Sequence, residues 1–192
     1  MGFWTTTGVA DPKRQFRFLL TIGSMPDGAT WYATGVNKPT VKVGSTAHKY
    51  LNHTFYYPGN VEWDEVTATL VDPVSPDASA NLTRILYESG YKIPMSPDDV
   101  STISKSAAVS AVQGVTIEQI DSEGKPVETW TLNNAWVTNV DYGGKLAYGE
   151  DALTQVSVSF RYDWADIKTA NAAVEGPGGV GGNRFWAPGQ ST

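Results

Sequence analysis

The two histidines are the side chains of this sequence best suited to bind a metal, and both lie in one polar, aromatic segment. His48 and His53 are five positions apart. In an extended segment, residues at this spacing face opposite sides. A protein metal site needs three or four converging ligands, and the sequence suggests no third. We therefore predict that both histidines are polar loop residues and that no metal is bound.

Clustered carboxylates are the next candidates for chemistry. Glu62, Asp64 and Glu65 are close in sequence, as are Glu118 and Asp121. A carboxylate pair catalyses acid–base reactions where its surroundings separate the two pKa values. Adjacent strand residues point to opposite faces, and no motif marks a cleft around these acids. The serines form no nucleophile motif such as G-x-S-x-G. We predict no catalytic residue, no cofactor and no enzymatic activity.

Composition excludes several further functions. The chain has 192 residues and no cysteine, so disulfides and thiol chemistry are excluded. Its net charge is −6, and no run of Lys or Arg provides the basic patch that attracts nucleic acid. No apolar stretch approaches the roughly 20 residues that span a bilayer, and the first twelve residues lack the features of a signal peptide. We expect no membrane insertion.

Aromatic residues are concentrated between positions 31 and 63. Large aromatic side chains contribute to cores and to interfaces, and they can also stack on sugars or bases. The sequence leaves three uses open: a hydrophobic core, a protein–protein interface or a ligand platform. The seven residues are Trp31, Tyr32, Tyr50, Phe55, Tyr56, Tyr57 and Trp63.

Apolar–polar alternation predicts a mainly β fold, an antiparallel β-sandwich or barrel with one or two short helices. The strand at residues 15–22 is expected to pair with 30–36 as a hairpin. A second hairpin is expected from 109–121 to 127–132, turning at Gly124. A last strand is predicted over 152–164.

The strand at residues 61–71 has the clearest alternation. One face carries Val66, Ala68 and Leu70, and the opposite face carries Glu65, Thr67, Thr69 and Val71. Before it, residues 37–60 form either a long functional loop or a separate hairpin with arms at 41–43 and 49–57.

Helix signals are fewer. Pro76–Asp77 predicts a helix start, with the helix running to about Glu88. Ser96–Asp99 predicts a second start, because a serine cap precedes proline and two acids. A third short helix is expected within 165–174. Residues 175–182 are predicted to be a Gly-rich linker before Phe185–Trp186.

Several segments occur in a characteristic order. They are KPTV and YPGNVEWD around the 37–60 segment, then VTATLVD, a helix, a hairpin, NNAWVTNVD and a final strand ending in YDW. This order resembles the tail tube proteins of contractile-tailed bacteriophages, a family that includes the tube proteins of related contractile injection systems. The resemblance covers residues 13–164, which gives a tail-tube β domain at 1–164 and a C-terminal extension at 165–192.

The resemblance implies a structural subunit that forms homohexameric rings. The sheets of the subunits would join into one barrel, and the rings would stack into a hollow tube that conducts DNA as passing cargo. The implied partners are the tail sheath, the baseplate initiator and the tail terminator. The implied location is the virion tail, assembled in the host cytoplasm.

The resemblance also assigns roles to residues. The segment after the first strands would reach the adjacent ring, and Glu65, Thr67 and Thr69 would line the lumen. Trp136 and Trp63 would be structural anchors. The implied inter-ring contacts are Lys38, Lys42, Lys49, Tyr50, Tyr56 and Tyr57.

Two alternatives remain open. A baseplate protein that initiates the tube shares this fold, and the sequence does not separate it from a tube subunit. A carbohydrate-binding β-sandwich that uses the aromatic segment is the alternative from another functional class.

Overall fold

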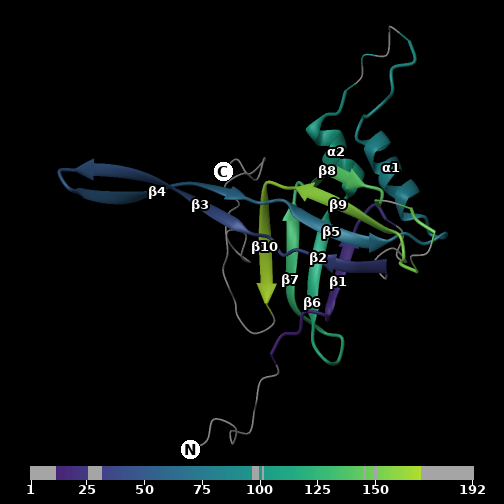
Figure 1. Ribbon diagram of the computed structural model, residues 1–192, viewed down its shortest axis with the longest axis horizontal. Helices are drawn as coiled ribbons and strands as arrows, with labels where there is room; N and C mark the ends of the chain where they lie inside the picture. The colour runs from purple at the N-terminus through teal and green to yellow at the C-terminus, as the bar shows by residue number, and fades with distance from the viewer. Residues whose placement is uncertain are drawn as a thin grey trace, which may run out of the picture.

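Two four-stranded antiparallel sheets pack face to face, and a two-stranded hairpin projects from them (Figure 1). The computed structural model describes residues 12–25, 32–96, 100, 102–144, 146–148 and 151–169. The strands of the two sheets cross one another in Figure 1. The predicted antiparallel, mainly β sandwich with short helices is confirmed. The described strands do not close into a barrel within one subunit.

The first sheet is formed by strands that are distant in sequence. Its order is β1 (Phe18–Ile22), β6 (Val115–Ile120), β7 (Pro126–Asn133) and β10 (Trp164–Thr169). The hairpin of β6 and β7 is confirmed, and Gly124 adopts a φ of 81° in its turn. Asp121 accepts backbone hydrogen bonds from Glu123 and Lys125, at 2.8 and 2.9 Å. These bonds fix the turn, so this carboxylate has a structural role.

The second sheet carries the clearest alternation. Its order is β2 (Ala33–Val36), β5 (Val66–Val71), β9 (Gln155–Arg161) and β8 (Trp136–Asp141). Buried and half-buried residues alternate along β5 as predicted, with Val66, Ala68 and Leu70 at most 1% exposed. Together with Phe160 of β9 they pack on the buried face of the first sheet, so one core joins the two sheets.

Two helices complete this core. In α1 (Ala78–Glu88), the Asp77 side chain accepts a hydrogen bond from the Ala80 N–H at 2.7 Å, which confirms the predicted start. The second described helix, α2 (Lys105–Val112), begins after the Ser104 cap, and its small apolar residues reach the core. The helix start predicted at Ser96–Asp99 depends on residues 97–99, which lie outside the described residues. Neither described helix is long and apolar enough to cross a membrane.

Three strand predictions are wrong, one on pairing and two on strand bounds. β1 pairs with β6 and β2 pairs with β5, so residues 15–22 and 30–36 form no hairpin. The turn after β1 is held against the end of α2, because Gly23 and Ser24 donate to Gly114 and Val112, at 3.0 and 3.1 Å. Residues 109–112 belong to α2, not to the strand predicted over 109–121. The strand predicted over 152–164 is two strands, β9 and β10, in different sheets.

The C-terminal part of the described chain is also different from the prediction. Residues 165–169 are strand, not helix, and pair with β7 along the whole of β10. This tertiary pairing overrides the helical tendency of the local sequence. The predicted domain boundary at 164 therefore coincides with the first residue of β10, and the sheet continues to Thr169. The Gly-rich segment and Phe185–Trp186 lie outside the described residues.

Residues 37–60 were predicted to form either a long loop or a separate hairpin, and the structure has the hairpin. Its strands are β3 (Val41–Tyr50) and β4 (His53–Trp63), joined by Leu51 and Asn52. The turn lies inside the predicted second arm, so both strands are longer than expected. The turn also places His48 and His53 on the same face, since His48 pairs with Phe55 and Tyr50 with His53. The prediction that they face opposite sides is wrong.

Candidate assembly surfaces

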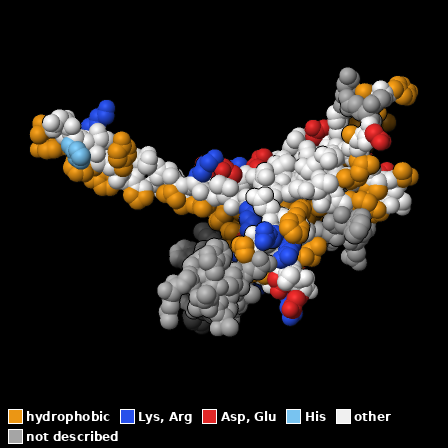
Figure 2. Space-filling model, turned by 60° about the horizontal axis from the view of Figure 1, so that its bottom comes forward, with side chains coloured by type: hydrophobic (Ala, Val, Ile, Leu, Met, Phe, Trp, Pro, Cys, Tyr) orange, Lys and Arg blue, Asp and Glu red, His pale blue; other side chains and the backbone are white. Residues whose placement is uncertain are grey.

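The hairpin exposes large apolar side chains along its whole length. Every residue of β3 is exposed, and Figure 2 shows hydrophobic side chains running from the body toward the tip. A two-stranded hairpin alone is marginally stable in water, and extended apolar surface marks interaction sites. The exposed apolar residues are Val41, Val43, Tyr50, Leu51, Phe55, Tyr56, Tyr57 and Val61.

A bulge divides the hairpin into an inner and an outer half. The register shifts between Val43 and Ser45, where Gly44 lies against the backbone around Gly59 and Asn60. A Cβ at Gly44 would approach the Asn60 carbonyl oxygen to 3.3 Å, and a Cβ at Gly59 would approach Gly44 equally closely. The paired glycines therefore permit a close backbone crossing and a local increase in twist.

The root of the hairpin is tied to the sandwich. The Asp64 N–H donates to the Thr40 carbonyl at 2.9 Å, and the Lys42 ammonium donates to the Asp64 carboxylate at 2.8 Å. Lys38, just before β3, donates to Glu128 at 2.6 Å and to Gln119 at 2.8 Å. These bonds fix the direction in which the hairpin leaves the body.

Glu128 is the most strongly perturbed acid of the described chain. Its side chain is 8% exposed and accepts bonds from Lys13, Lys38 and the Trp130 indole. Burial acts to raise the pKa of Glu128, but the hydrogen bonds from these partners outweigh it and lower the pKa to about 2. The carboxylate therefore stays charged and anchors the segment that leads into β3.

The implied inter-ring residues fall into three places. Lys49, Tyr50, Tyr56 and Tyr57 lie on the outer half of the hairpin, exposed to solvent. Lys42 lies at the root. Lys38 lies on the body, and its ammonium is used within the subunit, paired with Glu128.

The outward face of the second sheet is lined by small hydroxyl side chains. Thr67 pairs with Ser159 and Thr69 with Ser157, and the Thr67 and Ser159 hydroxyls are 3.0 Å apart. Glu65 precedes β5, outside the core, and its side chain is 44% exposed. Its carboxylate lies 4.0 Å from Arg161, a surface contact that contributes little stability.

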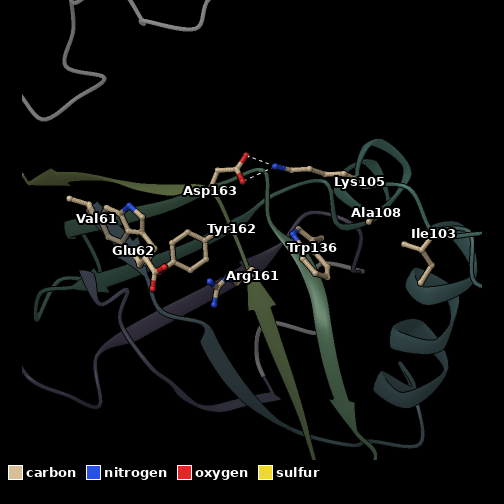
Figure 3. Close-up of a pocket in the computed structure, with 10 residues that line it drawn as sticks. Val61, Glu62, Ile103, Lys105, Ala108, Trp136, Arg161, Tyr162 and Asp163 are labelled. Carbon is tan, nitrogen blue, oxygen red and sulfur yellow. Dashed lines mark hydrogen bonds and ion pairs between the residues drawn. The ribbon is translucent and has the colours of Figure 1, made fainter. Parts of the chain in front are cut away.

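A groove of about 560 Å³ lies beside the hairpin root (Figure 3). One wall comes from β4 and the other from Ile103 and the start of α2, with Trp136 between them. Trp63 and Tyr162 also line it, with ring centroids 6.0 Å apart. Trp136 is half-buried at the first position of β8, so it lines this groove rather than the core. Trp63 packs against the core. Ten residues line the groove: Val61, Glu62, Trp63, Ile103, Lys105, Ala108, Trp136, Arg161, Tyr162 and Asp163.

The floor and the back wall of the groove are polar at specific points. Tyr162 is 4% exposed, and its hydroxyl makes no hydrogen bond of normal geometry with another described residue. Burial raises the pKa of Tyr162, and the Asp64 charge acts in the same direction. The backbone of Thr40 acts in the opposite direction, so the buried hydroxyl lies against the hairpin root.

Asp163 joins three elements behind the groove. Its carboxylate accepts from Lys105 at 2.7 and 2.8 Å, and from the Asn134 amide at 2.7 Å. Burial acts to raise the pKa of Asp163, but the hydrogen bonds from Lys105 and Asn134 outweigh it and lower the pKa. These contacts fix the start of α2 against the two segments that connect the sheets, β7 to β8 at Asn134 and β9 to β10 at Asp163. Nothing in the sequence around Asp163 indicated this role.

The described residues contain no group of three His, Asp or Glu side chains arranged to hold a metal. The predicted carboxylate candidates are separated: Asp64 pairs with Lys42, and Asp121 fixes a turn. The described chain therefore presents three surface features: the hairpin, the hydroxyl face and the groove.

Solved structures share this fold, although no protein-family model and no curated protein matches the sequence. The tube-terminating cap of the anti-feeding prophage (AFP) has a TM-score of 0.60 at 16% identity, over 88% of this chain and 100% of the cap chain. A chain of the AFP baseplate gives 0.57 at 16%, over 85% and 100%. A chain of the PVC sheath–tube complex, from an extracellular contractile injection system, gives 0.59 at 14%, over 82% and 92%. The chain thus shares its fold with a chain of each of these three assemblies.

Proposed function

We propose that this protein is a structural, non-enzymatic subunit of a contractile tail tube. Homohexameric rings would stack into a hollow tube that conducts DNA, inside a sheath and between a baseplate initiator and a tail terminator. Assembly would take place in the host cytoplasm before the tail becomes part of the virion. The observation that carries this proposal is the uncovered β3–β4 hairpin on a body with this fold.

The hairpin supports stacking because it is incomplete within one subunit. Tyr56 is 71% exposed and Tyr57 is 57% exposed, yet both belong to a regular strand. A neighbouring subunit would bury these side chains. Such burial contributes about 25 cal/mol of favourable free energy per Å² of apolar surface removed from water. A contact between the hairpin and a different surface of the next copy is heterologous, and such contacts build rings or open stacks.

The second sheet supports a lumen wall. Among the described strands, β2 and β8 each have a neighbour on one side only, so they can pair with the edges of adjacent subunits. The hydroxyl face with Thr67 and Thr69 would then point toward the channel, with Glu65 at its end. Such a wall offers phosphates no cationic patch, so DNA would pass without being held.

Cap and baseplate roles are the alternatives within this fold. The three structural likenesses have TM-scores between 0.57 and 0.60 and do not favour one role. A tube subunit polymerises along the axis, whereas an initiator or a terminator stops at one ring. Polymer length is therefore the property that separates them.

The register of the hairpin leaves the carbohydrate-binding alternative open. Tyr50, Phe55 and Tyr57 share one face of the hairpin, and Tyr56 projects from the other. Three aromatic rings on one face are compatible with a platform for sugar stacking. Exposed aromatic side chains on both faces favour instead a hairpin inserted between protein surfaces.

Negative-stain electron microscopy across a protein concentration series tests the proposal. Hollow tubes that lengthen with concentration would support a tube subunit, and single rings at every concentration would support a cap or initiator. Monomers at every concentration, with binding on a glycan array, would overturn the assembly role in favour of carbohydrate recognition.

A further inference from the structure

We propose that the groove beside the hairpin root receives the hairpin tip of a second copy of this chain. The inference rests on the proposed assembly function and specifies its contact. It names both partners: Lys49, Tyr50 and Leu51 from one copy, and the groove between β4, β8 and α2 from the other (Figure 3).

The groove has the features of a receiving site. Its volume of about 560 Å³ is in the range that buries a compact apolar group. Trp63, Trp136 and Ile103 supply apolar walls, and Ile103 is 52% exposed. The Tyr162 ring also lines the groove, whereas its hydroxyl is buried.

The hairpin tip has the features of a ligand. Leu51 is 89% exposed and Tyr50 is 64% exposed, at the point of the hairpin most distant from the body. Leu51 has a φ of 53°, which places its side chain on a tight, protruding turn. A turn that presents two large apolar side chains to water gains free energy when both enter a groove.

Charge supports the same pairing. Glu62 lies on the rim of the groove and forms no ion pair with another described residue. Lys49 lies next to the tip, and within the described part of the chain it also has no ion-pair partner. Insertion of the tip would bring the Lys49 ammonium toward the Glu62 carboxylate, so the two unpaired charges complement each other.

The length of the hairpin requires that the contact be between copies. The groove borders the root, and β4 runs 11 residues from the tip to that root. At about 3.3 Å per residue, the tip is roughly 35 Å from its own groove. A tip-to-groove contact therefore joins two copies whose grooves are separated by about the length of the hairpin. Because donor and acceptor surfaces differ, the contact is heterologous, and it continues along an axis when the two copies lie in successive rings.

Site-specific crosslinking tests the contact, and the chain is suited to it because it contains no cysteine. Leu51→Cys and Ile103→Cys proteins are made separately, mixed before assembly and treated with a short bis-maleimide. Covalent dimers are expected in the mixture and not in either protein alone. The control mixture contains Leu51→Cys and Val74→Cys, because Val74 is 100% exposed and does not line the groove. That control should stay monomeric on a denaturing gel.

A charge exchange gives a second readout. Lys49→Glu and Glu62→Lys should each raise the protein concentration needed for assembly at least tenfold. The double variant should restore assembly at the original concentration. Rings or tubes without a Leu51–Ile103 crosslink, or equal crosslinking to Val74, would overturn the groove assignment and leave the tube function intact. Absence of any assembly by the unmodified protein would overturn both.

Discussion

The sandwich and the hairpin use the same residue types in opposite ways. Phe160 of β9 is fully buried, whereas Phe55 of β4 is 46% exposed in an equally regular strand. The sandwich has a core formed within one chain, so we expect it to fold without a partner. The hairpin has regular backbone pairing but no core, so its stability depends on what covers it. The difference separates folding from assembly, and the two should respond to different mutations.

Truncation of the sandwich core should have the largest effect. Phe160→Ala removes a ring at the centre of the core and should lower the free energy of unfolding by about 3–5 kcal/mol. Urea denaturation of the monomer measures this loss. The matched control is Tyr57→Ala on the hairpin, which should change monomer stability by less than about 0.5 kcal/mol. Equal losses for the two variants would contradict the comparison.

Removal of the outer hairpin should abolish assembly and leave the body folded. Residues 45–58 are replaced by an Asn-Gly turn, which suits a two-residue hairpin loop. The melting temperature of the monomer should be unchanged, because β3 contributes no buried residue. Sedimentation velocity should find only monomers at concentrations where the unmodified protein forms rings or tubes. Normal assembly of the shortened protein would show that assembly does not require the outer hairpin.

Loss of the Glu128 carboxylate should have an intermediate, pH-dependent effect. Glu128→Gln should cost about 1–3 kcal/mol at neutral pH, since two lysines lose a charged acceptor. The folded-state pKa of Glu128, about 2, lies below its ordinary value of 4.5. Its stabilisation is therefore present above pH 4.5 and is lost as the pH falls toward 2. Thermal melts from pH 7 to pH 2 should show a smaller decline for the variant than for the unmodified protein.

Truncation of Trp136 should lower stability less than the Phe160 and Glu128 substitutions do. The residue lines the groove and is half-buried, so Trp136→Ala should cost about 1–2 kcal/mol, less than a buried tryptophan. Assembly should weaken more than folding does, because the groove loses a wall. A loss of 3–5 kcal/mol in urea denaturation of the monomer would place the indole in the core and favour a purely structural anchor.

Local features of this protein could be predicted because neighbouring residues determine them. The alternation in β5 follows from the pleat, which sends successive side chains to opposite faces. The start of α1 follows from Asp77, whose side chain accepts a backbone N–H of the first turn. The same alternation was sufficient to predict that Thr67 and Thr69 lie on the face opposite the core. Their role in a channel remains a prediction.

Pairing could not be predicted in the same way. β1 and β2 are consecutive strands, yet each pairs with a strand from much later in the chain. The Gly23 and Ser24 bonds to the end of α2 help direct this separation, and no sequence signal marks them. The groove was also missed, because its walls come from residues 61–63, 103–108, 136 and 161–163. Only the packing of the elements brings these residues together.

The sequence by itself determined the β class, the phase of the main strands, the first helix and the absence of cysteine chemistry. These properties depend on residue types and on periods of a few positions. The tertiary structure decided which strands share a sheet, how Lys38 and Glu128 anchor the hairpin, and where the groove lies. The physical reason is that burial and long-range hydrogen bonding depend on partners far along the chain. Local sequence patterns do not specify which distant residues those partners are.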